Sequence, residues 1–204
     1  MNLPKISGLI PGVVLGALLF AACSGTPSDG RAVLDNIASR TSVRTFQQRP
    51  VGADTVELLL RAAMAAPSAR DRRPWAFVVV DDKTLLRQLA DSLPYAQSAA
   101  AAPMAVVVCG VLSESRGATN AGWWVQDAAA ASENLLLAAH AVGLGAVWTG
   151  VYSYEDRVRA VRNILGLPRH VVPLNVIPVG YPAENPVPKQ KWDPSKVRRN
   201  GWAE

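Results

Sequence analysis

Hydrophobic residues along the chain fall into two periodic patterns, which alternate from residue 32 to residue 179. Spacings of three and four residues predict amphipathic helices, and short continuous apolar runs rich in β-branched residues predict buried strands. The helical spacing covers residues 32–39, 54–66, 83–93, 122–142 and 153–166, and the apolar runs cover residues 75–80, 104–112, 146–151 and 171–179. This order predicts an α+β domain in which a small sheet is flanked by helices.

Two of these segments carry a further constraint. No Asp, Glu, Lys or Arg lies between Asn134 and Tyr154. The longest helix is therefore expected to be buried on all sides, at the centre of the fold or at a subunit interface. Pro173 and Pro178 interrupt the last strand, which is therefore expected to be irregular or to lie at an edge of the sheet.

Residues 1–23 differ from the rest of the chain. Lys5 is their only charged residue, and a short apolar stretch leads to small residues before Cys23. This pattern predicts a secretory signal peptide with a bacterial lipobox, so that Cys23 becomes the lipidated N-terminus of an exported, membrane-anchored lipoprotein on the periplasmic or extracytoplasmic face. Residues 24–31 are expected to form a linker and residues 32–204 the globular domain. The alternative is a start codon assigned too far upstream of a cytoplasmic protein.

Composition argues against several classes of protein. Half of the 204 residues are hydrophobic, which is enough for a globular core. The formal net charge of +5 is concentrated near predicted loops, without a basic stripe and exposed aromatic residues, so nucleic-acid binding is not expected. His140 and His170 lack cysteine or carboxylate ligands at metal-binding spacing, and Cys109 lies in an apolar strand, so no metal site is expected.

Two basic stretches contain the candidate chemistry. Residues 67–74 place three arginines, one aspartate and one serine between a helix and a buried strand, and residues 40–44 place two arginines and a serine one helix upstream. A connection this charged is either a solvated loop or a site for an anionic ligand. Taken together, the two stretches suggest that one holds a phosphate and the other a ring system.

Five short blocks, in order along the chain, give a resemblance to a known family. They are Arg40-x-Ser42-x-Arg44, Pro67-Ser68 with Pro74-Trp75, Gly143-Leu-Gly-Ala-Val-Trp-Thr-Gly150, Pro178-Val-Gly-Tyr-Pro182 and Lys189-x-Lys191-Trp192. Together they span residues 36–202 and resemble the nitroreductase family of FMN-dependent oxidoreductases. The resemblance implies a small mixed sheet and a homodimer whose C-terminal arms are exchanged between subunits. It also implies two FMN sites at the interface, each built from both subunits.

The activity that the resemblance implies is a two-step oxidation and reduction. Hydride passes from NADH or NADPH to N5 of the flavin and then to an electron-poor acceptor, such as a nitro compound or a quinone. The flavin carries this chemistry, so no catalytic protein residue is assigned. The alternatives are a flavin-dependent dehalogenase or dehydrogenase on the same fold, and a non-catalytic flavin-binding lipoprotein.

The resemblance also implies a set of FMN contacts. Phosphate donors would be the arginines and serine of residues 40–44, together with Lys191 and Lys189. The Thr149-Gly150 backbone would approach N5, since glycine has no side chain to block it. The full set of matching positions is Arg40, Ser42, Arg44, Pro67, Ser68, Ala69, Asp71, Val147, Trp148, Thr149, Gly150, Lys189 and Lys191.

Two of the positions at the flavin ring depart from the family's pattern. The family commonly has Asn-x-Gln-Pro-Trp where this chain has Asp71-Arg72-Arg73-Pro74-Trp75. An amide donates and accepts at the pyrimidine edge of the flavin, whereas an ionised aspartate only accepts. Arg73 is expected to offset the charge of Asp71, and the departure affects the redox potential more than FMN binding.

Overall fold

The computed structural model describes residues 30–112 and 122–202. The chain divides into two units, Met1–Gly30 and Arg31–Glu204, and all the described residues except Gly30 belong to the second. The predicted signal peptide, Cys23 and most of the predicted linker lie outside the described residues. Among the helices that are described, none combines the length and hydrophobicity needed to cross a bilayer.

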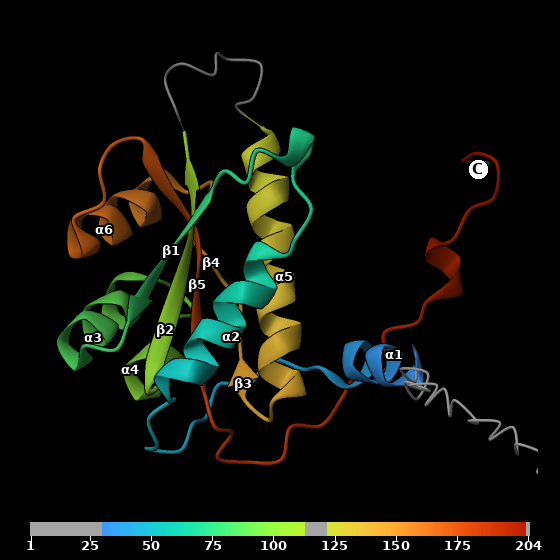
Figure 1. Cartoon of the computed structure of the whole chain (residues 1–204), viewed down its shortest axis with the longest axis horizontal. Helices are drawn as coiled ribbons and strands as arrows, with labels where there is room; N and C mark the ends of the chain where they lie inside the picture. Colours follow the sequence, from blue (N-terminus) through green and yellow to red (C-terminus); the bar gives the residue numbers. More distant parts are fainter. Residues whose placement is uncertain (1–29, 113–121, 203–204) are drawn as a thin grey trace, which may run out of the picture. The chain divides into compact units, whose positions relative to one another are not determined.

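The described elements follow the predicted order (Figure 1). The helices are α1 (Gly30–Ser39), α2 (Ala53–Met64), α3 (Lys83–Ser92), α4 (Ser98–Ala101), α5 (Trp123–Ala141) and α6 (Glu155–Leu165), and the two 3-10 turns are η1 (Ala69–Asp71) and η4 (Pro194–Lys196). The strands are β1 (Trp75–Val80), β2 (Met104–Val111), β3 (Gly145–Ala146), β4 (Thr149–Gly150) and β5 (Val171–Gly180). The single strand expected over residues 146–151 is thus two short strands.

The strands form one sheet in the order β1-β2-β5-β3, and β4 also pairs with β5. All of these strand pairs are antiparallel. The predicted α+β class is therefore confirmed, but the expected mixed sheet is wrong for the named strands. Parallel pairing occurs at an isolated bridge between Ser42 and Ala146.

Helices cover both faces of the sheet, as predicted. Alternate residues of β2 point to opposite faces because the side chains of a strand alternate. Met104, Val106 and Val108 pack in the core with α2 and α5, and Ala105 and Val107 pack in the core with α3 and α6. Figure 1 shows α2 and α5 on one side of the strands and α3 and α6 on the other.

The strand with two prolines lies inside the sheet, between β2 on one side and β3 and β4 on the other. An edge position for residues 171–179 is therefore wrong, and the alternative of an irregular strand is confirmed by a register shift between Val108 and Cys109 of β2. On the other side, the pairs of β3 and β4 involve only residues 175–176 and 179–180 of β5. Because pairing there skips Pro173 and Pro178, that side of the strand accommodates residues without an N–H donor.

A close approach between β2 and α5 depends on glycine. A Cβ atom built on Gly110 would lie 2.1 Å from Cε3 of Trp124. Trp124 is buried, and its ring packs edge-on against Tyr152 at 4.8 Å between ring centroids. Gly110 therefore lets the start of α5 lie directly against the sheet.

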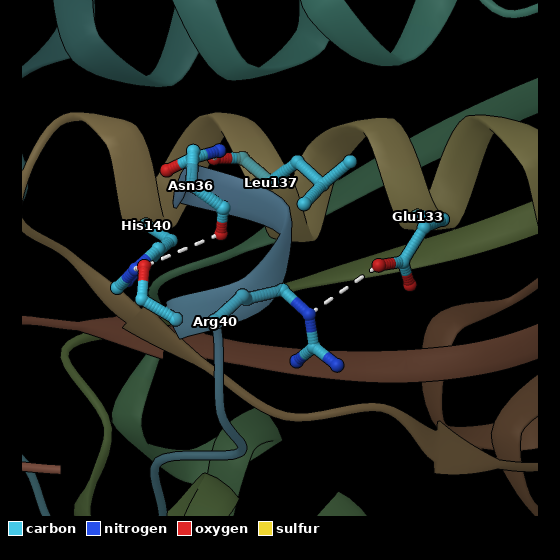
Figure 2. A network of polar contacts seen from close by, with 6 residues as sticks. Asn36, Arg40, Glu133, Leu137 and His140 are labelled. Atoms are coloured by element: carbon cyan, nitrogen blue, oxygen red, sulfur yellow. Dashed lines mark hydrogen bonds and ion pairs between the residues drawn. The ribbon is translucent and has the colours of Figure 1, made fainter. Parts of the chain in front are cut away.

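Helix α1 contacts the rest of the domain through polar groups (Figure 2). The side-chain amide of Asn36 donates to the Leu137 carbonyl at 3.1 Å, and Ser39 Oγ lies 2.8 Å from His140 Nε2. None of the residues of α1 is buried. Its apolar side chains Val33, Leu34 and Ile37 are exposed in a single chain.

Candidate functional site

Strand β4 consists of Thr149 and Gly150, the two residues predicted to approach flavin N5. The strand is held by backbone pairing with Val176 and Asn175 of β5. Thr149 is buried, and among the described residues no atom lies within 4 Å of the position that a Cβ atom would occupy on Gly150. The structure therefore fixes this backbone firmly and leaves open space beside the glycine.

The two residues before β4 differ in exposure. Val147 is buried, and its N–H donates to the Pro178 carbonyl at 3.3 Å. Trp148 keeps 37 % of its surface exposed. The structure thus places Val147 in the core and Trp148 at the surface, next to the predicted ring site.

A buried polar network lies behind β4. The Asn175 amide donates to Ser132 Oγ at 2.8 Å, and the Ser132 hydroxyl donates to the Ala128 carbonyl at 2.8 Å. Within the described part of the chain, Thr149 Oγ1 and Asn175 Oδ1 have no hydrogen-bond partner. Because buried polar atoms are normally paired, these two atoms are candidates for contact with a group that the described residues do not supply.

Arg157 and Tyr154 lie next to Gly150. The Arg157 guanidinium stacks on the Tyr154 ring at 3.8 Å from the centroid, and its Nη1 donates to the Gly150 carbonyl at 3.4 Å. This arrangement places a positive charge beside the predicted ring site. Neither residue was predicted from the sequence, because the spacing of α6 shows only an amphipathic surface helix.

Residues 68–73, called the loop below, carry the second half of the predicted ring site. Arg70, Asp71 and Arg73 have φ values of 56°, 51° and 50°, in the left-handed region that non-glycine residues rarely adopt. The Arg73 N–H donates to Ser68 Oγ at 2.9 Å and helps to close the loop. Such unusual backbone angles persist only where surrounding contacts hold them, and they are frequent at ligand sites.

Asp71 and Arg73 pair with each other at the surface. The guanidinium donates to both carboxylate oxygens, at 2.8 and 2.6 Å. The hydrogen bond and charge of Arg73 lower the pKa of Asp71 below its ordinary value, and Asp71 raises the pKa of Arg73. Arg73 therefore offsets the charge of Asp71 by direct contact, although both side chains are largely exposed.

The loop is attached to α5 by a buried carboxylate. Asp127 Oδ1 accepts a hydrogen bond from the Ala69 N–H at 2.9 Å, across 58 residues of sequence. Asp127 keeps only 7 % of its surface exposed. The sequence held a signal for this residue, since Asp127 is a charged residue in an otherwise mostly apolar stretch of α5.

The predicted phosphate block lies beside β3. Ser42 forms the parallel bridge with Ala146, and the next residue donates its N–H to the Ala146 carbonyl. Arg40 Nε lies 3.3 Å from Glu133 Oε1 on α5 (Figure 2), whereas Arg44 is exposed. The bridge brings the basic stretch to the strand that leads into Thr149, so the structure connects these two predicted parts of the site.

The remaining predicted residues are less closely connected. Pro67 is exposed, immediately before the loop, whereas Lys189 and Lys191 are exposed in the segment that follows β5. Within the described residues, no hydrogen bond or ion pair joins either lysine to another predicted contact. A single chain therefore connects residue 42 with residues 146–150, whereas the loop is attached to α5 and the two lysines to neither.

Comparisons with known proteins agree with this fold. The family model described as "Nitroreductase family" matches residues 37–107 and 91–181. A protein from Methanothermobacter thermautotrophicus named "Putative NADH dehydrogenase/NAD(P)H nitroreductase" is 45% identical over 170 residues, which cover 83% of this chain and 87% of the relative.

Two solved structures extend the comparison. A protein of the same name from Parabacteroides distasonis has a TM-score of 0.78 and 49% identity, covering 83% of this chain and 98% of the other. An FMN-dependent nitroreductase from Clostridium difficile has a TM-score of 0.75 and 26% identity, covering 83% of this chain and 99% of the other. The chain therefore belongs to the nitroreductase family, as its sequence blocks predict.

Proposed function

We propose that this protein is an FMN-dependent oxidoreductase that uses NADH or NADPH. One observation carries the proposal: the basic stretch at residues 40–44 and the Thr149-Gly150 strand are joined through the Ser42–Ala146 bridge. Ala146, which pairs with Ser42, is three residues before Thr149. The donors for a phosphate therefore lie close to the Thr149-Gly150 backbone, which is open on one side. The names of the relatives from Methanothermobacter thermautotrophicus and Clostridium difficile support both the nucleotide and the cofactor.

The residues present fit FMN. The ion pair of Arg40 uses Nε, and no contact among the described residues engages its two amino groups. Ser42 and Arg44 are exposed, so this stretch offers fork-shaped cationic donors and a hydroxyl for a phosphate dianion. At the ring end, the open space beside Gly150 and the unpaired Thr149 hydroxyl leave room and hydrogen-bonding capacity for a flat polar ring.

Each part of the chain has a separate task in this proposal. Residues 40–44 hold the phosphate, Thr149 and Gly150 present their backbone to the ring, and the loop covers the ring of the partner subunit's site. Arg157 places its positive charge beside Gly150. Bound FMN would supply the hydride chemistry that links the nicotinamide to an electron-poor acceptor such as a nitro compound or a quinone.

The experiment that tests the proposal starts with the absorbance spectrum of the purified full chain, which should show bound flavin and bleach on addition of NADH or NADPH. Arg44→Ala should weaken FMN binding by about 1.5–3 kcal/mol, the scale of a hydrogen bond to a charged group. Riboflavin lacks the phosphate and serves as the matched control, so its affinity should hardly change. A chain that binds no flavin would contradict the proposal.

The proposal includes a homodimer with exchanged C-terminal arms. Its support is the apolar surface that a single chain leaves exposed, including Val33, Leu34 and Ile37 on α1 and Trp192 and Trp202 in the segment after β5. A segment with so little of its own core is expected to lie on another surface. Sedimentation should give a dimer, and truncation after Pro182 should release both the partner and FMN. A folded, FMN-loaded monomer would contradict it.

We also propose that Cys23 carries a lipid that anchors the exported protein. The support is the sequence pattern of residues 1–23 alone. Because acyl chains would supply the membrane affinity, Cys23→Ser should move the protein from the membrane fraction to the soluble fraction. A membrane fraction that the substitution leaves unchanged would exclude lipidation at this residue.

A further inference from the structure

The loop at residues 68–73 needs an attachment outside itself. Three of its residues hold left-handed backbone angles, which are unfavourable for residues other than glycine. The contacts of Arg73 with Ser68 and Asp71 lie within the loop and are largely exposed. They close the loop but do not fix it relative to the sheet or to α5.

The attachment is a side chain of α5. Among the hydrogen bonds of the described residues, the one between Asp127 Oδ1 and the Ala69 N–H is the only one that joins the loop to a distant element. Its length of 2.9 Å is that of a good hydrogen bond, and a charged acceptor makes such a bond stronger than a neutral one.

Burial makes this carboxylate unusual. Asp127 is nearly covered, and no ion pair within the described part of the chain supplies a cation for it. A buried carboxylate without a cation is costly, and an alanine would occupy the same helix face without that cost. The hydrogen bond to the Ala69 N–H is therefore the interaction that explains a carboxylate at this position.

We propose that Asp127 is a positioning residue for the FMN site, because its carboxylate anchors the Ala69 N–H and so holds residues 68–73 in the shape that contacts the flavin ring. The cofactor named in this inference rests on the proposed function, whereas the anchoring of the loop does not. The hydrogen bond between Asp127 and Ala69 links α5, which lies against the sheet, to the loop, which depends on side-chain contacts.

The test compares Asp127→Ala with Asp127→Asn in the full chain. The amide side chain of asparagine keeps an oxygen acceptor, whereas alanine has none. Asp127→Ala should raise the FMN dissociation constant about tenfold, and Asp127→Asn should stay within about threefold of the wild type. Flavin fluorescence measures both constants. Rescue by asparagine separates anchoring from a general loss of stability.

Hydrogen exchange of the FMN-free chain gives a second measurement. The Ala69 amide should exchange faster in Asp127→Ala and at nearly the wild-type rate in Asp127→Asn, while the Val107 amide in β2 should stay protected in both. Unchanged Ala69 exchange and unchanged FMN affinity in Asp127→Ala would overturn the inference. A wild type that binds no FMN would overturn the proposed function, and the exchange measurement would still decide the anchor.

A reciprocal variant covers the case in which Asp127→Ala does not fold. Ala69→Pro removes the donor and keeps the carboxylate. Proline suits this position, because Ala69 is the first residue of η1 and Ser68 before it is extended, with φ −140° and ψ 154°. Faster exchange of the hydrogen-bonded amides of residues 71–73 is expected. Full protection of those amides would also overturn the inference.

Discussion

The two sides of the proposed FMN site are held in opposite ways. On the sheet side, which consists of β4 with β5 and β2 behind it, backbone pairing fixes Thr149 and Gly150, and the surrounding residues are buried. On the loop side, residues 68–73 are exposed or half-buried and depend on the side chains of Ser68, Asp71 and Asp127. The sheet side should therefore tolerate side-chain changes that leave its packing intact, whereas the loop side should respond to the loss of single atoms.

The largest expected difference concerns the reactivity of Cys109 on the sheet side. Burial raises the pKa of its thiol from 9.0 to about 12. Near pH 8 this lowers the thiolate fraction about a thousandfold relative to the unfolded chain, because each unit of pKa is a factor of ten. Labelling of a Cys23→Ser variant with a thiol-specific disulfide reagent should be at least that much slower in the folded chain. Rapid labelling under native conditions would mean that the sheet side opens readily.

The next effect should come from the contact between Gly110 and Trp124. Gly110→Ala forces a methyl group into the indole ring and should lower the free energy of unfolding by about 1–3 kcal/mol, the usual cost of overpacking. Urea denaturation followed by circular dichroism measures this change. Gly122→Ala is the control, since no described atom lies within 4 Å of its Cβ position, and only the small cost of replacing the N-cap glycine of α5 is expected. Equal losses in both variants would contradict a specific close contact.

A smaller effect is expected when one hydroxyl group is removed from each side of the site. Ser68→Ala leaves the Arg73 N–H without its acceptor and should favour opening of the loop by about 0.5–1.5 kcal/mol, measured from exchange of the Arg73 amide. Thr149→Val removes a buried hydroxyl that has no partner in the described chain, so the FMN-free protein should keep its stability or gain some. A clear loss in Thr149→Val would show that another group satisfies this hydroxyl.

The smallest expected effect concerns the pair of Asp71 and Arg73. Its contribution to stability is present above the ordinary carboxyl pKa of 3.8 and is lost as the pH falls through the lowered pKa of the folded chain. Arg73→Gln should return the pKa of Asp71 toward 3.8, which a carboxyl NMR titration measures. The midpoint of thermal unfolding near neutral pH should hardly move, because exposed ion pairs contribute little. An unshifted pKa would mean that the pair does not form in solution.

Local patterns were sufficient to predict most elements. The limits of β1 are as predicted, because six apolar residues lie between Pro74 and the Asp81-Asp82 pair. Asp82 begins α3 by accepting hydrogen bonds from two backbone N–H groups of the first turn. Such signals depend only on neighbouring residues, and a single sequence contains them.

The central position of β5 was not predictable from its own residues. Its two prolines are unfavourable in a continuous ladder, and the discontinuity that accommodates them comes from β3 and β4, more than twenty residues earlier. The same limit applies to the site. The resemblance predicted Ala69 as an FMN contact. The role of Asp127 was not predicted, because it depends on a hydrogen bond to a residue 58 positions away.

The attachment of α1 has a mechanical consequence within one protomer. The chain passes through α1 before it reaches the sheet, and the contacts of Asn36, Ser39 and Arg40 with α5 are polar contacts at its C-terminal end. If the proposed lipid tether is present, tension applied through it would reach α1 and these polar contacts before it reached the sheet. In a single protomer, loss of these contacts would lengthen the tether before the strands that form the site are strained, and packing of α1 against a partner subunit would raise the force that this requires.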